Sequence, residues 1–207
     1  MSRVFLASRN AKKLAEMQRI LREHAPDVEV LGLDDVTAYD EPVEDRATFE
    51  GNALVKARAG LAATGLPTLA DDSGLCVDAL NGMPGVLSAR WSGLPKDDDR
   101  NNRLLLDQLA DVPDERRGAR FVCAVAFCHP DGTEVVVHGE MAGRVIREQK
   151  GSGGFGYDVL FVADQHLADG TTSAELPAAE KDAISHRGQA LREIAPVVAQ
   201  ALGTATG

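Results

Sequence analysis

The hydrophobic and polar positions in the first third of the chain predict a strand, a helix, a second strand, a loop and another helix. The short apolar run at residues 4–7 is typical of a buried strand, and apolar residues then recur at helical spacing over residues 14–21. Residues 28–33 form a second apolar run, whereas residues 34–47 are rich in acids and show no apolar period. Thr48 can cap a helix that runs to about residue 63.

The rest of the chain predicts strands and helices in irregular order. Residues 68–70 form an apolar strand that we expect to stop at Asp71-Asp72-Ser73-Gly74, with residues 75–80 extended beyond it. Further strands are expected at 121–129, 133–146 and 159–163, and further helices at 97–109, 177–185 and 187–202. Strands and helices mix without strict alternation, which predicts an α/β fold with a mixed sheet.

Composition and charge narrow the classes of function. With 207 residues, 44% of them hydrophobic, the chain suits one domain over residues 1–207, or one domain divided into two lobes. A net charge of −10 argues against a nucleic-acid polymer as partner, but it allows a small phosphorylated ligand held by a local basic pocket. The longest apolar run, residues 121–128, is too short to span a membrane, and no signal peptide is expected. Three cysteines without zinc-like spacing are expected to be reduced and buried, which favours a cytoplasmic location.

The first concentration of polar groups follows the first predicted strand. In Ser8-Arg9-Asn10-Ala11-Lys12-Lys13 a strand turns directly into a helix, and the free backbone N–H groups of such a turn can hold phosphate. Asn10 and Lys13 are three residues apart and therefore share a helix face. The alternative is a common N-cap followed by solvated lysines.

The second concentration is the acidic pair Asp71-Asp72, which follows an apolar strand. Neighbouring side chains of a strand point to opposite faces, so both carboxylates cannot enter one site unless the backbone turns. We expect Asp72 to face the site as a metal ligand or general base, and Asp71 to bond to backbone or to a neighbouring cation. The alternative is an ordinary Asp-Ser-Gly turn, although acids next to a buried strand are costly unless paired or metal-bound.

The third concentration is the glycine-rich loop 151–156, which precedes Tyr157 and Asp158. Its glycines match G-x-G-x-x-G, but a predicted strand follows where a dinucleotide-binding site needs a helix. No Lys-Ser or Lys-Thr pair follows, so the loop is not a Walker loop either. Phe155 in a mobile loop can serve as a platform for a base, or it can fill the core beneath a hairpin.

The fourth concentration is Lys181 together with Ser185-His186-Arg187-Gly188. On one continuous helix Lys181 and Arg187 would diverge, since they are six residues apart. A break at Ser185 would let His186 and Arg187 project from the start of the last helix. The alternative is a solvated histidine–arginine pair on the surface.

Together these blocks resemble the inosine-triphosphate pyrophosphatases, most closely their bacterial branch. The resemblance covers about residues 4–202 and rests on SRNAKK, TFEGNALVKA, LADDSGL, GMPGVLSARWSG, GGFGYD and ISHRGQAL, in this order. Several such blocks in the right order are more specific than any single one.

The resemblance implies an elongated mixed sheet flanked by helices, two lobes around a central nucleotide-binding cleft, and a homodimer. It implies hydrolysis of inosine, deoxyinosine and xanthosine triphosphates to the monophosphate and pyrophosphate, with Mg²⁺ as cofactor. Asp72 would be the general base and, with Glu44, a metal ligand. The substrate-binding residues it implies are Ser8, Arg9, Asn10, Ala11, Lys12, Lys13, Lys56, Ser73, Phe155, Gly156, Tyr157, Asp158, Lys181, His186 and Arg187. One departure is Gly51, because the residue before Asn52 is often acidic in this family.

Selectivity for these purines would depend on the 6-position of the base. A keto oxygen accepts hydrogen bonds from His186 or Arg187, whereas the amino group of adenine would leave buried donors unpaired. The alternatives are a pyrophosphatase or phosphatase of different base preference, a catalytically silent nucleotide sensor, and a dimeric scaffold. A sensor has no need of both a candidate base and a second metal ligand, and polar clusters at strand ends argue against a scaffold.

Overall fold

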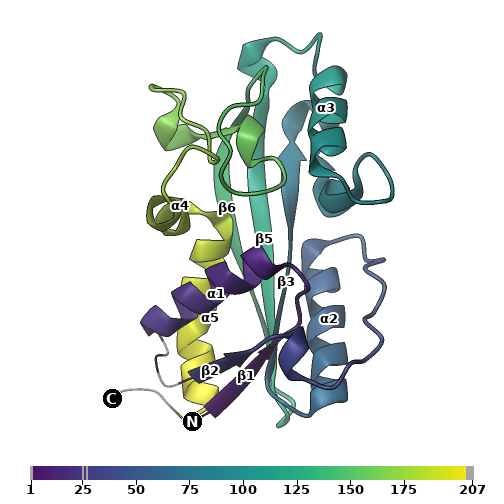
Figure 1. Cartoon of the computed structure of the whole chain (residues 1–207), viewed down its shortest axis with the longest axis vertical. Helices are drawn as coiled ribbons and strands as arrows, with labels where there is room; N and C mark the ends of the chain where they lie inside the picture. The colour runs from purple at the N-terminus through teal and green to yellow at the C-terminus, as the bar shows by residue number, and fades with distance from the viewer. Residues whose placement is uncertain (1, 25, 27, 204–207) are drawn as a thin grey trace. The chain divides into compact units, whose positions relative to one another are not determined.

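The computed structural model of the chain describes residues 2–24, 26 and 28–203 and has the predicted α/β class with a mixed sheet (Figure 1). The helices are α1 (Ala11–His24), α2 (Phe49–Thr64), α3 (Asp98–Gln108), α4 (Ala178–Ile184) and α5 (His186–Ala201). The strands are β1 (Ser2–Leu6), β2 (Val28–Leu31), β3 (Thr68–Val77), β4 (Met83–Pro84), β5 (Gly118–Cys128), β6 (Glu134–Val145) and β7 (Phe161–Ala163).

The pairing of the strands brings the turn after β1 next to the middle of β3. Within the described residues the sheet has the order β2-β1-β3-β5-β6-β7, and β4 pairs with β3. β1 is parallel to β2 and β3, whereas β4 is antiparallel to β3 and β7 is antiparallel to β6. Leu6 lies opposite Leu69, and the backbone N–H of Ala7 donates to the carbonyl of Leu69 at 2.9 Å. The residues that follow Ala7 are therefore close to those that follow Leu69.

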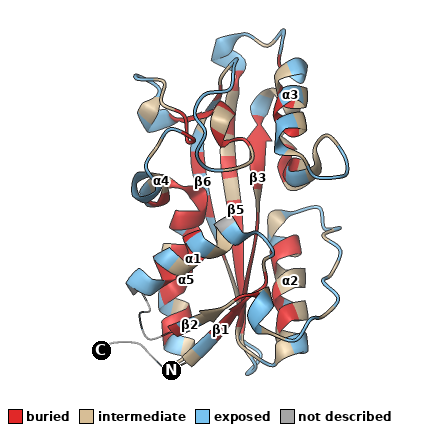
Figure 2. Cartoon of the chain, viewed as in Figure 1, coloured by how far each residue is buried: buried red, intermediate tan, exposed pale blue. Residues whose placement is uncertain are grey.

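The chain forms two compact units. Unit 1 consists of Met1–Asp72, Cys123–Gly139 and His186–Gly207, and unit 2 consists of Ser73–Val122 and Glu140–Ser185. Figure 2 shows that the strands and α5 carry many of the buried residues. No helix in the described part of the chain is long and apolar enough to cross a membrane.

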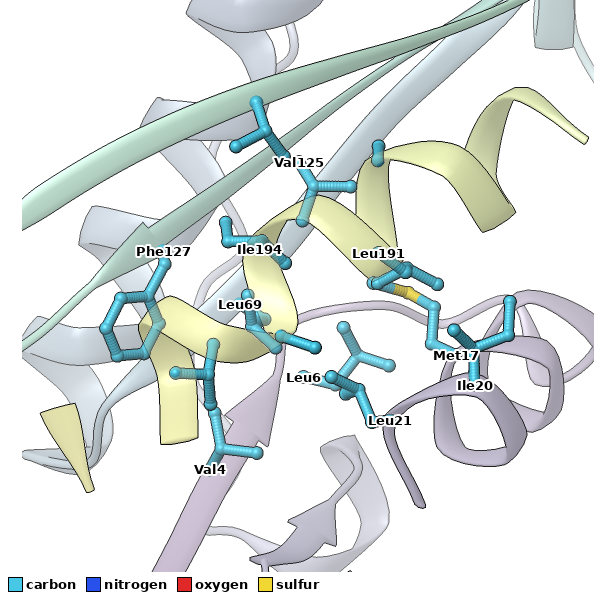
Figure 3. Close-up of a cluster of buried hydrophobic side chains, with 14 of the residues drawn as sticks. Val4, Leu6, Met17, Ile20, Leu21, Leu69, Val125, Phe127, Leu191 and Ile194 are labelled. Carbon is cyan, nitrogen blue, oxygen red and sulfur yellow. The ribbon is translucent and has the colours of Figure 1, made fainter. Parts of the chain in front are cut away.

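Unit 1 has helices on both faces of its part of the sheet. On one face α1 and α5 pack against β1, β3 and β5 in a cluster that includes Val4, Leu6, Met17, Leu69, Val125, Leu191 and Ile194 (Figure 3). On the other face α2 packs in a cluster of mostly small side chains that includes Phe5, Ala53, Ala57, Ala70, Ala126 and Cys128. Cys123 and Cys128 belong to opposite clusters, and Cys76, Cys123 and Cys128 are all buried and free, as expected.

Unit 2 has its own hydrophobic core. Leu105 of α3 and the C-cap residue Leu109 belong to it. Strands β5 and β7 contribute Phe121 and Phe161, whose ring centroids are 4.7 Å apart. Tyr157 is also part of this core, with its hydroxyl donating to the Ser88 carbonyl at 2.9 Å.

Several local predictions are confirmed by the backbone. The Thr48 hydroxyl accepts from the N–H of Gly51 at 3.1 Å and caps α2, which ends at Gly65 in the left-handed conformation. Ser185 separates α4 from α5, with ψ of 148°, so the predicted break is present. The sequence Pro130-Asp131-Gly132 is typical of a hairpin turn, and it does form the turn between β5 and β6, with Gly132 at φ 94°.

The prediction for strand β3 is wrong in its bounds. The strand does not stop at Asp71 but continues through Asp72, Ser73 and Gly74 to Val77, and residues 78–80 then form a 3-10 turn. An extended backbone is compatible with the acidic pair because each carboxylate finds partners on its own face of the sheet. The last predicted strand is also shorter than expected, because a 3-10 turn at Asp158–Leu160 precedes Phe161.

Candidate active site

Strand β3 directs Asp71 and Asp72 to opposite faces of the sheet in unit 1. Leu69 packs with the cluster of α1 and α5, and Ala70 packs with the cluster of α2. Because side chains alternate along a strand, Asp71 lies on the face of α1 and α5 and Asp72 lies on the face of α2. Both are buried, with 1% and 8% of their surface exposed. The two carboxylates therefore have separate environments, as the sequence predicted.

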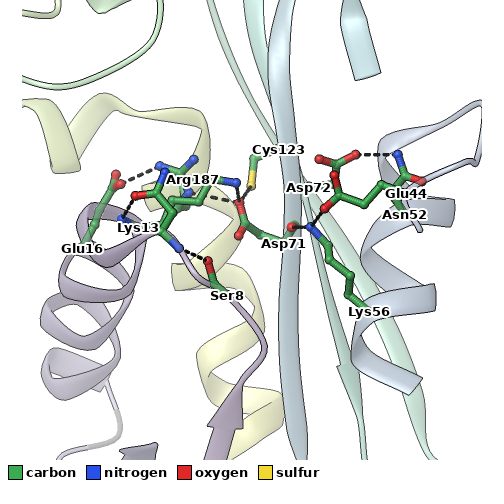
Figure 4. Close-up of polar contacts among 11 residues, drawn as sticks. Ser8, Lys13, Glu16, Glu44, Asn52, Lys56, Asp71, Asp72, Cys123 and Arg187 are labelled. Carbon is green, nitrogen blue, oxygen red and sulfur yellow. Dashed lines mark hydrogen bonds and ion pairs between the residues drawn. The ribbon is translucent and has the colours of Figure 1, made fainter. Parts of the chain in front are cut away.

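Asp71 is held between two cations (Figure 4). Lys13 Nζ lies 2.7 Å from Asp71 Oδ2, and Arg187 Nε lies 3.3 Å from the same oxygen. Arg187 Nη1 also donates to Glu16 Oε2 at 2.5 Å, and Cys123 Sγ lies 4.0 Å from Asp71 Oδ2. The prediction that Asp71 bonds to a neighbouring cation is confirmed. Lys13, Asp71, Arg187 and Glu16 form an ion-pair cluster that joins α1, β3 and α5.

The charges around Asp71 determine the protonation states of Asp71 and Cys123 at neutral pH. Burial by itself raises the pKa of a carboxyl group, but Lys13, Arg187 and Lys56 outweigh burial and hold the pKa of Asp71 far below its usual range. Burial, together with the negative charge of Asp71, raises the pKa of the Cys123 thiol to about 12. Asp71 is thus an anion and Cys123 a neutral thiol at pH 7, and neither is suited to proton transfer.

Asp72 has a different electrostatic environment. Its Oδ2 accepts a hydrogen bond from Asn52 Nδ2 at 2.8 Å, and Asn52 Oδ1 accepts from the backbone N–H of Arg46 at 2.9 Å. Burial raises the pKa of Asp72 and the charge of Glu44 adds to this, although Lys56 and Asn52 oppose it. A carboxylate with a raised pKa is a better proton acceptor than an ordinary aspartate, so Asp72 has the properties of a general base.

Lys56 of α2 connects Glu44 to strand β3. Its Nζ donates to Glu44 Oε1 and to the backbone carbonyl of Asp71, in both cases at 2.6 Å. Burial lowers the pKa of a lysine, but the charges of Asp71, Glu44 and Asp72 outweigh burial and raise the pKa of Lys56. Lys56 is therefore a fixed cation next to Glu44 and Asp72, the two carboxylates that the resemblance assigns to a metal.

The oxygen donors of Glu44 and Asp72 are of the kind that a hard divalent cation prefers. No group of three or more histidine, cysteine, aspartate or glutamate side chains among the described residues is arranged to hold a metal. Glu44 and Asp72 do interact electrostatically, since Glu44 raises the pKa of Asp72, and both offer only oxygen donors. Mg²⁺ commonly binds through one or two carboxylates and completes its shell with water and phosphate oxygens. Glu44 and Asp72 match that requirement.

The turn from β1 into α1 has the features of a phosphate-binding turn. Asn10 Oδ1 accepts from the backbone N–H of Lys13 at 3.2 Å and caps α1, and Ser8 Oγ accepts from the N–H of Asn10 at 3.3 Å. Arg9 is exposed and pairs with Glu41, and Ala11 is the exposed first residue of the helix. The side chain of Lys12 lies outside the part of the chain that the structure describes. Lys13 reaches Asp71, so it is not the solvated lysine of the alternative reading.

His186 and Arg187 begin α5 in unit 1 and are both buried, with 6% and 2% of their surface exposed. The alternative of a solvated surface pair is therefore wrong. Gly139 of β6 lies directly beneath this turn, because a Cβ atom added there would be 1.9 Å from the carbonyl oxygen of His186. The start of α5 is thus packed against the sheet at backbone distance.

Unit 2 brings together Phe155, Asp158 and Lys181, which the resemblance assigns to the substrate. The backbone N–H of Phe155 donates to Asp158 Oδ2 at 2.8 Å, and Lys181 Nζ donates to the same oxygen at 2.6 Å. Lys181 Nζ also lies 5.3 Å from the centroid of the Phe155 ring, a cation–π distance. Phe155 is only half-buried, so it does not fill the core; the buried aromatic side chain of the loop is Tyr157. Ser73, at the start of unit 2, is half-buried in β3.

Sequence reasoning missed two buried residues of the unit 1 site, Asn52 and Glu16. Asn52 is a weak helix former that is nevertheless placed inside α2, near its start, which was a signal for a side-chain role. Glu16 gave no signal, because a glutamate in a helix is ordinary and its partner Arg187 is 171 residues away. Gly51 packs against the loop before α2, where an added Cβ would lie 2.8 Å from Arg46 Cβ. The acid that is often present before Asn52 would therefore displace this loop.

The fold and the unit 1 site define a class of protein. It is an α/β protein with a capped strand-to-helix turn, two lysines and two carboxylates around the middle of one strand, a constellation suited to phosphate chemistry. Comparison with known proteins then identifies the chain as a member of the Ham1 family, whose model matches residues 4–197. The family resemblance drawn from the sequence motifs is confirmed.

Relatives of similar length carry a common name. A protein from Nocardia farcinica named dITP/XTP pyrophosphatase is 63% identical over 200 residues, which are 96% of each chain. One of the same name from Corynebacterium efficiens is 57% identical over 205 residues, covering 97% of this chain and 99% of the relative. The crystal structure of the nucleoside-triphosphatase / dITP/XTP pyrophosphatase from Mycobacterium abscessus has a TM-score of 0.76 at 55% identity, covering 94% of this chain and 99% of that one. A HAM1 protein from Coxiella burnetii has a TM-score of 0.85 at 39% identity, covering 97% and 100%.

Proposed function

We propose that this chain is a nucleoside-triphosphate pyrophosphatase that hydrolyses inosine, deoxyinosine and xanthosine triphosphates to the monophosphate and pyrophosphate. Its membership of the Ham1 family and its identity to proteins named dITP/XTP pyrophosphatase support the reaction and the purine class. The observation that carries the mechanism is the divergence of Asp71 and Asp72, since only Asp72 has a raised pKa and an environment suited to a base.

In the proposed reaction Asp72 accepts a proton from a water molecule that attacks the α-phosphorus. Asn52 holds the carboxylate of Asp72 in one orientation, because its amide is itself fixed by the backbone of Arg46. The capped start of α1 and the ammonium group of Lys13 stabilise negative charge on the pyrophosphate that leaves. When substrate binds, the ammonium group of Lys13 would leave its ion pair with Asp71 and contact phosphate instead. Arg187 would remain as the cationic partner of Asp71.

We propose Mg²⁺ as the cofactor, with Glu44 and Asp72 as its protein ligands. A bound Mg²⁺ would neutralise charge on the phosphates. Lys56 contributes a second positive charge at this place and keeps Glu44 beside strand β3.

The base would stack on Phe155, whose backbone is tied to Asp158 and whose ring is approached by Lys181. His186 or Arg187 would donate to the 6-keto oxygen that inosine and xanthosine share. The ion pairs of Arg187 with Glu16 and Asp71 fix its guanidinium in place, which suits a residue that discriminates by geometry. A homodimer and a cytoplasmic location, both carried over from the resemblance and the composition, belong to the same proposal.

Pyrophosphate release tests this proposal directly. Inosine, xanthosine, guanosine, adenosine and uridine triphosphates are supplied at equal concentration with and without Mg²⁺, and pyrophosphate and orthophosphate are measured separately. We expect magnesium-dependent pyrophosphate release largely confined to the inosine and xanthosine nucleotides. Orthophosphate as the product would contradict the cleavage site, and equal rates on all five would contradict the base selectivity. Tight nucleotide binding without turnover would favour a nucleotide sensor.

A further inference from the structure

The glycine-rich loop of unit 2 is held by its backbone, for example where the N–H of Gly153 donates to the carbonyl of Ala174 at 3.0 Å. Gly151, Gly154 and Gly156 all have positive φ angles, which glycine adopts readily and other residues rarely do. Residues 151–154 are exposed, and the first side chain of the loop that enters the core is Tyr157. The direction of the Phe155 ring therefore depends on the groups that hold the backbone on either side of it.

Two side chains of helix α3 hold the peptide groups that follow Phe155. The backbone N–H of Gly156 donates to Asp98 Oδ2 at 2.8 Å, and Asn102 Nδ2 donates to the carbonyl of Gly156 at 2.9 Å. Asp98 and Asn102 are four residues apart on one helix, so they project from the same face. Together they hold both backbone groups of Gly156, while Asp158 holds the N–H of Phe155 on the other side.

Helix α3 is a firm support for this clamp of Asp98 and Asn102. Asp97 caps the helix by accepting from the N–H of Arg100 at 2.9 Å, and Leu105 and Leu109 lie fully buried in the core of unit 2. Asn101, which is also buried, holds the backbone N–H and hydroxyl of Ser92, both at 2.8 Å. A group fixed to this helix moves little relative to the core.

Asn102 has a feature that a merely structural residue would avoid. Its side chain is buried, with 2% of its surface exposed, yet Oδ1 has no hydrogen-bond partner among the described residues. A buried acceptor without a partner is unfavourable and requires an explanation in a native structure. The explanation is that the side-chain amide of Asn102 is needed as the donor to the Gly156 carbonyl, even though its own oxygen is left without a partner.

We propose that Asp98 and Asn102 are positioning residues for nucleobase recognition, because they hold the Gly156 peptide and thereby orient the Phe155 ring. The inference rests on the proposed function, in which the base stacks on Phe155. Neither residue touches the substrate. Their removal should weaken interactions with the base and leave the phosphate interactions unchanged.

Separate binding of the two products tests the clamp. Isothermal titration with inosine monophosphate reports the base, and titration with inorganic pyrophosphate reports the phosphates, each in the presence of Mg²⁺. For Asp98→Ala and Asn102→Leu we expect the Kd of inosine monophosphate to rise roughly fivefold to tenfold, as for the loss of one ordinary hydrogen bond. The Kd of pyrophosphate should stay within about twofold. In turnover of inosine triphosphate, the weaker binding of the base should appear mainly as a higher KM, with kcat changed less.

Two control variants make the result specific. Asp99→Ala removes an exposed acid from the same turn of α3 and should behave as the wild type. Asp98→Asn retains an oxygen acceptor for the Gly156 N–H and should recover much of the affinity lost in Asp98→Ala. Because Asp98 is exposed, Asp98→Ala keeps the test valid if Asn102→Leu does not fold.

The results distinguish the clamp from the function on which it rests. Wild-type affinity for inosine monophosphate in Asp98→Ala and Asn102→Leu would overturn the clamp while leaving the proposed function intact. Equal weakening of both products would also overturn it, because that outcome indicates general loss of structure. A wild-type protein that neither binds inosine monophosphate nor hydrolyses inosine triphosphate would overturn the proposed function, and the clamp with it.

Discussion

Asp71 and Asp72 are identical side chains at neighbouring positions, and their surroundings displace their pKa values in opposite directions. Three cations lower the pKa of Asp71, whereas at Asp72 burial and the charge of Glu44 outweigh two lysines and one amide. The difference arises because the strand sends one side chain to the face of α1 and α5 and the other to the face of α2. The chemical role of each residue is thus decided by its face of the sheet.

At the residue scale, Asp72→Asn should abolish most of the turnover without unfolding the protein. Loss of a general base typically lowers the rate by about 10²–10⁴-fold. Asn is similar in size to Asp and can still accept a hydrogen bond from Asn52, so the thermal unfolding midpoint should change little. Pyrophosphate release from inosine triphosphate and thermal unfolding, measured on the same preparation, check this. Near-normal turnover would remove Asp72 from the mechanism.

At the scale of elements, the ion-pair cluster is the polar connection between α1, β3 and α5. Its members lie far apart in the sequence, with Lys13 and Asp71 separated by 58 residues and Glu16 and Arg187 by 171. Removing one partner from a buried ion pair leaves an uncompensated charge in the interior. The cluster should therefore be sensitive to single changes.

Arg187→Met should lower the free energy of unfolding by about 3–5 kcal/mol, since Glu16 then stays buried without its cation. Arg58→Met is the matched control, because Arg58 pairs with Glu134 through two hydrogen bonds but is largely exposed. An exposed pair contributes about 0–1 kcal/mol. Urea unfolding of both variants gives the comparison, and equal losses would contradict the structural role of the cluster.

Gly139→Ala should displace the start of α5. A methyl group at this position would lie 1.9 Å from the His186 carbonyl and 2.9 Å from the backbone nitrogen of Ala190, neither of which can rotate away. Overpacking of this kind costs about 1–3 kcal/mol. Because His186 and Arg187 begin the displaced helix, turnover should fall as well.

Gly32→Ala is the control for Gly139→Ala, since its methyl would meet the side-chain atom Leu14 Cδ2 at 3.0 Å, which can move. Thermal unfolding and pyrophosphate release measure both effects. A Gly139→Ala protein as stable and active as Gly32→Ala would show that the contact is unimportant.

Much of the element pattern could be predicted from the sequence because its signals are local. The cap at Thr48, the break at Ser185 and the glycine turn at Gly132 each depend on a few neighbouring residues. The end of β3 was misjudged for the same reason, because the partners that satisfy Asp71 and Asp72 come from helices distant in the sequence. No local rule places Lys13 beside Asp71.

The candidate site was predictable to a similar extent. The motifs located Asp72, Lys13, Lys56 and Arg187 by resemblance, and strand alternation correctly separated Asp71 from Asp72. Supporting residues such as Asn52 and Asn102 were not found, because an asparagine in a helix has no characteristic spacing from the group that it holds. Their partners, Asp72 and Gly156, are 20 and 54 residues away.

At the scale of the whole molecule, strands β3, β5 and β6 each contribute residues to both units. The chain therefore passes from one unit to the other three times within a continuous strand and once between α4 and α5, and we predict that the two units unfold as one domain. We expect a single unfolding transition, with calorimetric and van't Hoff enthalpies that agree. Differential scanning calorimetry tests this, and two resolved transitions would mean that the units unfold independently.

The two environments on β3 also have a consequence for covalent labelling. Carbodiimides activate a carboxyl group in its protonated form, so in mildly acidic solution the acid with the raised pKa is the susceptible one. Of the adjacent pair, Asp72 should be modified and Asp71 should be spared, since the latter stays an anion between Lys13 and Arg187. A bound triphosphate would shield Asp72, and the chain would then resist inactivation by the reagent.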